Sequence, residues 1–109
     1  MKYVIDIDGT ICVTKLGDYG NSTPIDYRIN FINQLYGRGN YIVYFTARGM
    51  NSSGEDPLVA KYNWENFIYN QLQNWGAKFH QLILGKPSAD FYIDDKFISI
   101  KNFFGENRE

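Results

Sequence analysis

The sequence predicts an α/β fold, a Rossmann-like three-layer sandwich with a mainly parallel sheet of about four strands. Short runs of β-branched and aromatic residues, typical of buried strands, alternate with longer segments that have helical spacing and helix-end signals. Polar residues with reactive side chains follow these short runs, as is typical where parallel strands end at a ligand site. The 109 residues are enough for one hydrophobic core, so we expect a single domain over residues 1–109.

The first half of the chain should supply two strands, a short flap and a helix. Residues 3–7 are apolar on both faces and read as a buried strand, and residues 41–45 have the same character. Between them, a flap-like hairpin should turn at residues 15–18. A helix is expected over residues 24–36, with Thr23 as its N-cap and Pro24 as its first residue. Its apolar stripe is Ile25, Ile29, Ile32 and Tyr36.

The second half should add a long helix, two strands and a closing segment. The helix is expected over residues 57–75, with Gly76 as its stop. Residues 81–84 and 91–93 read as the last two strands, and residues 97–104 as a short apolar turn or helix. The apolar contacts expected of the long helix include Leu58, Tyr62, Phe67, Tyr69 and Leu72.

Composition excludes several classes of protein. With 44% hydrophobic and 21% charged residues, the chain is neither disordered nor collagen-like, and no apolar stretch is long enough for a signal peptide or a membrane span. A formal charge of -1 gives no global positive field for nucleic acid or anionic lipid. Cys12 and His80, the single cysteine and histidine, cannot form an internal disulfide or a zinc site, and we expect them to be packing residues. A cytoplasmic protein fits best.

Two carboxylates mark the end of the first expected strand. Asp6 and Asp8 are two residues apart, so in an extended segment both face the same way, and Gly9 then permits a sharp turn. Neighbouring anions repel each other by roughly 4 kcal/mol at 4 Å and intermediate dielectric. An adjacent cation is therefore expected.

Three other strand ends supply complementary groups. Thr46 offers a hydroxyl, Lys86 a positive charge, and Asp94 with Asp95 a second pair of carboxylates. Carboxylate and carbonyl oxygens favour Mg²⁺, which proteins usually hold beside substrate phosphates. Anions, metal, lysine and hydroxyl together suit phosphoryl transfer.

These motifs resemble the four signatures of the haloacid dehalogenase superfamily of phosphotransferases, in order along the chain. The matching residues are Asp6-Ile7-Asp8-Gly9-Thr10, Thr46, Lys86 and Asp94-Asp95. Within the superfamily, the segments around Asp18-Tyr19, Thr46-Ala47-Arg48, Gly85-Lys86-Pro87 and Phe91 to Asp95 look like the short phosphatases of bacterial capsule and surface-polysaccharide gene clusters.

The resemblance implies a Mg²⁺-dependent phosphomonoester hydrolase. Asp6 would be the nucleophile that forms an aspartyl-phosphate, and Asp8 the acid that later serves as base. Mg²⁺ would be held by Asp6, the backbone carbonyl of Asp8, and Asp94 or Asp95. Thr46 and Lys86 would hold the phosphoryl oxygens. Asp8 itself favours phosphoester chemistry over dehalogenation.

The spacing of the motifs leaves no room for the cap domain that many relatives carry. The site should therefore be open to a phosphorylated small molecule or saccharide, unless a neighbouring subunit of a homo-oligomer covers it. Position alone nominates Arg48, Asp18, Tyr19 and the loop 51–55 for substrate contact, and Gly9 and Thr10 for the turn that faces the substrate.

Two other functions remain open. One is a polynucleotide 3′-phosphatase, against which the net charge weighs. The other is a signalling module in which Asp6 accepts phosphate, against which the order of the motifs weighs.

Overall fold

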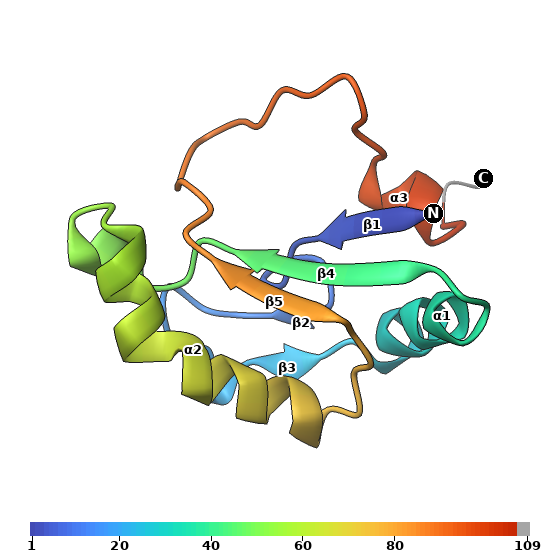
Figure 1. Ribbon diagram of the computed structural model, residues 1–109, viewed down its shortest axis with the longest axis horizontal. Coiled ribbons are helices and arrows are strands. Elements are labelled where there is room, and N and C mark those ends of the chain that lie inside the picture. Colours follow the sequence, from blue (N-terminus) through green and yellow to red (C-terminus); the bar gives the residue numbers. More distant parts are fainter. Residues whose placement is uncertain (107–109) are drawn as a thin grey trace.

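A three-stranded parallel sheet organises the fold in a computed structural model that describes residues 1–106 (Figure 1). Its strands are β1 (Lys2–Ile5), β4 (Tyr41–Thr46) and β5 (Gln81–Leu84), in the order β1-β4-β5. This arrangement confirms the α/β class. The last three residues of the predicted domain lie outside the described residues.

Two helices cover one face of this sheet. The chain runs from β1 through α1 (Asp26–Gly37) to β4, and through α2 (Pro57–Asn74) to β5, stepping across the sheet in one direction. Right-handed crossovers then place both helices on the same face, and Figure 1 shows them on the same side of the strands. Residues of both helices join one core cluster with the inner residues of the strands. Its members include Ile5, Ile42, Tyr44, Leu84, Ile29, Ile32, Ile68 and Leu72.

The first helix begins two residues later than the sequence predicted. Thr23–Pro24 is not the start of a helix but the short strand β3, paired antiparallel with β2 (Cys12–Val13) to form the flap hairpin. The N–H of Ile25 donates to the carbonyl of Ile11 at 2.8 Å, which holds the chain extended up to the helix. Pro24 therefore serves at a strand end, where its missing donor costs nothing.

The long helix agrees with the prediction in its bounds and in the burial of Leu72, but not in the rest of its buried face. Asp56 accepts a capping hydrogen bond from the N–H of Leu58, and Pro57 takes the first position. The buried residues are Ala60, Ile68 and Leu72, whereas Leu58 and Tyr62 are 77% and 90% exposed. Leu58 and Tyr62 therefore lie on the solvent side of α2, although Ala60 between them is buried. Phe67 and Tyr69 are also partly exposed.

β1 is not buried on both faces as expected. It forms the edge of the sheet, and Val4 is 60% exposed. No helix of the described residues covers the face to which Val4 points. Within residues 1–106, no helix has the length and apolar character needed to cross a membrane.

The predicted fourth strand is absent. Residues 91–93 have no strand pairing, and Phe91 and Ile93 are 85% and 98% exposed. Six residues separate Leu84 from this segment, whereas a parallel strand of the same sheet needs a crossover of about a dozen. The chain instead arches away from β5 and returns to β1 through α3 (Ile100–Phe103), which confirms the closing helix (Figure 1).

Two short 3₁₀ turns complete the elements beside the site. They are η1 (Tyr19–Asn21), within the flap, and η2 (Asn51–Ser53), after β4.

Candidate active site

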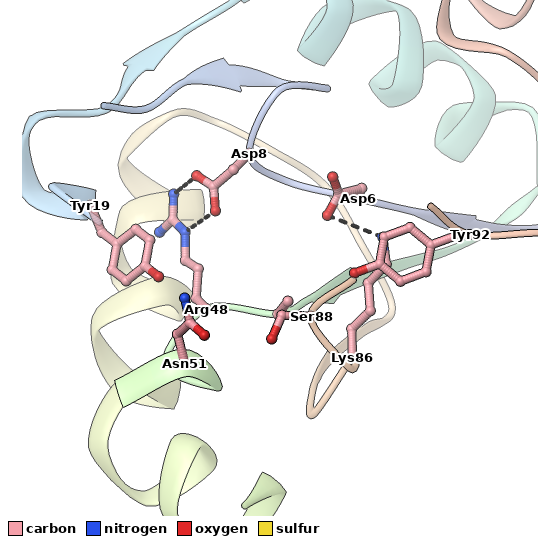
Figure 2. A pocket seen from close by; sticks show the side chains of 9 residues that line it. Asp6, Asp8, Tyr19, Arg48, Asn51, Lys86, Ser88 and Tyr92 are labelled. Carbon is pink, nitrogen blue, oxygen red and sulfur yellow. Dashed lines mark hydrogen bonds and ion pairs between the residues drawn. The ribbon is translucent and has the colours of Figure 1, made fainter. Parts of the chain in front are cut away.

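The carboxyl ends of the three parallel strands open onto one cavity of about 250 Å³ (Figure 2). This is where open α/β sheets bind ligands. Residues from the strand ends, the flap and the loop after β5 meet there. The lining residues are Asp6, Asp8, Tyr19, Ala47, Arg48, Asn51, Lys86, Ser88 and Tyr92.

Asp6 lies just after β1 and faces Lys86, which β5 delivers. The Lys86 Nζ is 3.5 Å from the Asp6 Oδ1. Burial raises the pKa of Asp6, and the positive charge of Lys86 partly offsets this effect. Lys86 therefore favours the ionised form of a carboxylate that the surrounding protein would otherwise neutralise.

Asp8 is held by Arg48 through two hydrogen bonds. Arg48 Nε donates to Asp8 Oδ2 at 2.9 Å, and Nη2 donates to Oδ1 at 2.8 Å. Thr14 Oγ1 donates to the same Oδ1 at 2.5 Å. Burial acts to raise the pKa of Asp8, but the hydrogen bonds from Arg48 and Thr14 outweigh it, so the pKa lies below its ordinary range. Asp8 is therefore an ionised group at neutral pH.

Arg48 lines the cavity, yet its side chain is fully buried. Its third nitrogen, Nη1, donates to Gln71 Oε1 at 2.6 Å, and its guanidinium lies 4.7 Å from the centre of the Tyr19 ring. Gln71 in turn donates to the Tyr19 carbonyl at 2.7 Å. These contacts occupy the guanidinium donors of Arg48, so it is a partner of Asp8 and not the substrate contact that the sequence predicts. Gln71 gave no signal in the sequence, because it comes from the middle of α2.

Three residues predicted for phosphoryl or substrate contact lie behind the cavity wall. Thr46 is 1% exposed, and its Oγ1 accepts from the Arg48 N–H at 3.1 Å. Gly9, with a φ of +81°, donates its N–H to the Cys12 carbonyl at 2.9 Å. Thr10 is buried. In this structure they shape the turns after β4 and β1 and do not line the cavity.

The flap and the loop after β4 contribute unequally. Tyr19 and Asn51 line the cavity as predicted. Asp18 does not, because its carboxylate accepts two hydrogen bonds from Asn21 within the flap. Glu55 accepts from the N–H and the hydroxyl of Ser88, and so ties the loop after β4 to the loop after β5.

Tyr92 and Ser88 are wall residues that the sequence reading missed. The Lys86 Nζ lies 4.3 Å from the centre of the Tyr92 ring, and the Tyr92 hydroxyl donates to the Pro87 carbonyl at 2.5 Å. The sequence predicts a strand at Tyr92. Its place beside Lys86 follows from the irregular path of the segment, which no periodicity predicts.

Asp94 and Asp95 are not brought to Asp6. Both lie exposed on the arched segment, where Asp94 accepts from the Lys96 N–H at 2.9 Å. In the described part of the chain, no group of three or more His, Cys, Asp and Glu side chains is placed to hold a metal ion. The residues as placed therefore do not form the ligand set that Mg²⁺ requires.

Cys12 and His80 have the structural roles that we expected. Cys12 is buried in the core. His80 stacks between Tyr36 and Tyr41, with ring centres 4.6 and 4.4 Å away, and its Nδ1 accepts from the Ile42 N–H at 3.0 Å.

Comparison with known proteins supports the fold. No model of a known protein family matches the chain, and no curated protein matches it. The structure is similar to the crystal structure of a Vibrio cholerae protein described as an MCSG target, with a TM-score of 0.82 and 29% sequence identity. The likeness covers 97% of this chain and 89% of that one, so it concerns the whole fold and not one motif.

Proposed function

We propose that this protein is a phosphomonoester hydrolase of the haloacid dehalogenase type, acting on a phosphorylated small molecule or saccharide through an aspartyl-phosphate. The observation that supports it best is the pairing of two carboxylates with two cations at one cavity. Asp6 faces Lys86, and Asp8 faces Arg48, at the ends of the three parallel strands. The order of the motifs along the chain agrees with this reading.

Asp6 is the better placed nucleophile of the two carboxylates. Its partner Lys86 sits on one side of Oδ1 at 3.5 Å, whereas both oxygens of Asp8 are taken by Arg48. An Asp6 oxygen attacks phosphorus, the bond from phosphorus to the ester oxygen breaks, and the electron pair leaves with that oxygen. Lys86 can stabilise the charge that gathers on the phosphoryl oxygens.

Asp8 is suited to the hydrolytic half of the reaction. Because it is ionised at neutral pH, it can take a proton from the water that attacks the phosphoryl group and breaks its bond to Asp6. To protonate the leaving oxygen in the first half, Asp8 must itself be protonated. A bound phosphate brings negative charge, which raises the pKa of a neighbouring carboxylate and so promotes that state.

The charges at the cavity favour a bound divalent cation. Two ionised carboxylates and a phosphate dianion carry four negative charges, against two positive charges on Lys86 and Arg48. A bound Mg²⁺ would neutralise the remainder. Since the side chains as placed do not form its ligand set, no step is assigned to it.

The open cavity bears on the substrate. Tyr19 and Tyr92 stand on opposite sides of it in Figure 2, with the carboxylates between them. A cavity of about 250 Å³ accommodates a phosphoryl group and part of what carries it, and the rest of the substrate can extend into solvent. Precursors of surface polysaccharides have this form, and a cytoplasmic site of action would suit them.

The test is phosphate release from a panel of sugar phosphates, nucleotides and 3′-phosphorylated oligonucleotides, with Mg²⁺ or EDTA. The Asp6→Asn variant should lose turnover, because an amide is a far weaker nucleophile. Glu65→Gln is the matched control: it makes the same carboxylate-to-amide change on an exposed face of α2 and should keep full activity. Turnover retained in Asp6→Asn would refute the proposal.

The two hydrogen bonds from Arg48 to Asp8 favour a second candidate function, that of a phospho-acceptor module. If Arg48 keeps both Asp8 oxygens occupied, Asp8 cannot take a proton from the attacking water, so hydrolysis of the aspartyl-phosphate slows and the modified protein accumulates. Its lifetime after treatment with a small phosphodonor separates the two functions. Persistence for minutes would indicate signalling, and decay within seconds would indicate a hydrolase.

A further inference from the structure

Two hydroxyl groups of the flap lie beside Asp8. Thr14 follows β2 and Ser22 precedes β3, so the antiparallel pairing of Val13 with Thr23 places Thr14 and Ser22 opposite each other. Their Oγ atoms are 2.6 Å apart, and both residues are partly buried, whereas Thr23 is exposed. Because side chains alternate along a strand, Thr14 and Ser22 share the face of the flap that is turned toward Asp8.

The neighbouring charged groups fix the direction of these hydrogen bonds. An ionised carboxylate only accepts, and a guanidinium only donates. Thr14 Oγ1 donates its one proton to Asp8 Oδ1 at 2.5 Å, so the proton between the two hydroxyls comes from Ser22. Arg48 Nη2 donates to Ser22 Oγ at 3.4 Å and to Asp8 Oδ1 at 2.8 Å. The four residues therefore form a closed ring in which every hydrogen bond runs from Arg48 toward Asp8.

This ring fills one Asp8 oxygen and leaves a place on the other. A carboxylate has about four acceptor sites, two on each oxygen. Oδ1 accepts from Arg48 Nη2 and from Thr14, and the Cys12 Sγ lies 3.5 Å from the same oxygen. Among the described residues, Oδ2 accepts only from Arg48 Nε, at 2.9 Å. Arg48 by itself therefore does not fill both oxygens, and Oδ2 keeps one lone pair for a proton.

We propose that Ser22 and Thr14 are positioning residues that hold Asp8 for the hydrolytic half of the reaction, an inference that rests on the proposed function. The Ser22 hydroxyl commits the Thr14 proton to Oδ1, and the filled Oδ1 leaves Oδ2 as the oxygen that serves as base. In that step the water oxygen bonds to phosphorus, and the water proton goes to Oδ2. The bond from phosphorus to the Asp6 oxygen breaks, and its electron pair stays on Asp6.

A second contact holds the flap to the same arginine. The Tyr19 ring centre is 4.7 Å from the Arg48 guanidinium, and the Tyr19 carbonyl accepts from Gln71 at 2.7 Å. Figure 2 shows Tyr19 on the side of the cavity where Asp8 and Arg48 lie, with Asp6 on the other side. The flap thus contacts the Asp8–Arg48 pair at two points, which keeps the two hydroxyls in place beside Asp8.

The test separates the two halves of the reaction in Thr14→Val and Ser22→Ala. The substrates are the panel named above and para-nitrophenyl phosphate, and mass spectrometry of acid-quenched protein gives the fraction held as aspartyl-phosphate. General base catalysis contributes roughly 10²–10⁴-fold, so a misaligned Asp8 should lower kcat by about tenfold. Because only the second half is slowed, KM should fall with kcat, kcat/KM should stay within about twofold, and aspartyl-phosphate should accumulate.

Two further variants distinguish positioning from a structural effect on the flap. Thr14→Ser keeps the hydroxyl and should recover most of the lost kcat. Thr23→Val makes the same change as Thr14→Val at the exposed face of the flap and should behave as the native protein. If Thr14→Val does not fold by circular dichroism, Ser22→Ala decides the question, because it removes one hydroxyl and leaves Thr14 intact.

A native kcat in Ser22→Ala and in a folded Thr14→Val would overturn the inference. So would a fall in kcat without accumulated aspartyl-phosphate, or an equal fall in Thr23→Val, since either result indicates a general loss of active protein. Asp6→Asn separates this failure from failure of the proposed function. If Asp6→Asn stops turnover while Ser22→Ala keeps it, only the positioning role is lost, whereas turnover retained in Asp6→Asn removes both.

Discussion

Arg48 and Asp8 form a two-pronged ion pair that links the turn after β1 to the turn after β4. Nε and Nη2 of Arg48 reach one oxygen each, at 2.9 and 2.8 Å, and the Arg48 side chain has no exposed surface. Planar, paired contacts of this kind fix both position and orientation. The geometry of Asp8 thus depends on a residue 40 positions away in the sequence.

Arg48→Ala should destabilise the protein by about 3 kcal/mol, because it leaves a partly buried carboxylate without its partner. Arg48→Lys should recover part of this loss, since it keeps the charge but not the fork of donors. Urea unfolding measures both. Lys61→Ala, which removes an exposed cation of α2, should change stability by less than about 0.5 kcal/mol. A loss in Arg48→Ala as small as in this control would contradict the assignment.

Tyr44→Phe should leave stability unchanged or raise it by up to about 1 kcal/mol. The Tyr44 hydroxyl is buried in the core and has no hydrogen-bond partner among the described residues. Burial also raises the pKa of Tyr44, so the hydroxyl is never ionised in the folded state at ordinary pH. Thermal unfolding of the two proteins tests this. A clear fall in the midpoint would mean that the hydroxyl has a partner, such as an internal water.

Asp94→Asn together with Asp95→Asn should raise the Mg²⁺ concentration needed for half-maximal phosphate release by about tenfold or more. The pair is exposed in this structure, so the arched segment must move for either carboxylate to approach Asp6. Asp90→Asn, a change to an exposed residue earlier in the same segment, is the control. An unchanged Mg²⁺ dependence in the double variant would remove the pair from the metal site.

The attachment of α3 should weaken in acid. Arg28 donates to both oxygens of Glu106, at 2.9 and 2.7 Å, and these hydrogen bonds hold the pKa of Glu106 below its ordinary range. Because the pKa of Glu106 is lower in the folded protein, its ionised form stabilises the fold at pH values above the unfolded pKa of about 4.3. This stabilisation is lost as the pH falls through the folded pKa. Hydrogen exchange of the α3 amides should therefore quicken in acid, after correction for intrinsic rates, and Glu106→Gln should abolish that dependence.

The elements with strong local signals were predicted well. β4 and β5 have continuous apolar runs, and α2 has an aspartate cap, a proline at its first position and a glycine stop. The segment 91–93 has an equally strong strand pattern and is wrong, because strand formation needs a partner within reach and not only a suitable composition. Val4 shows the same limit: its burial depends on which strand lies at the edge.

The sequence predicts the charged residues that meet at the candidate site, but not the side chains that surround and hold them. Asp6, Asp8 and Lys86 meet as expected because parallel strands end at one edge of the sheet. Arg48 was expected at substrate and instead holds Asp8, and Gln71 was not foreseen. Side-chain partners of this kind depend on packing between distant segments, which a local pattern does not contain. Tyr92 lines the cavity because residues 91–93 do not form a strand of the sheet.

The junction between β5 and α2 limits how this scaffold can be redesigned. Gly85 has a φ of +95°, and a Cβ at this position would lie 2.9 Å from the Cβ of Pro57. Lys86, the next residue, donates its N–H to the Thr46 carbonyl at 3.2 Å. Insertions in the loop 51–56 that shift Pro57 would therefore be transmitted to the lysine beside Asp6. A library intended to broaden substrate range should vary the flap and keep the length of that loop fixed.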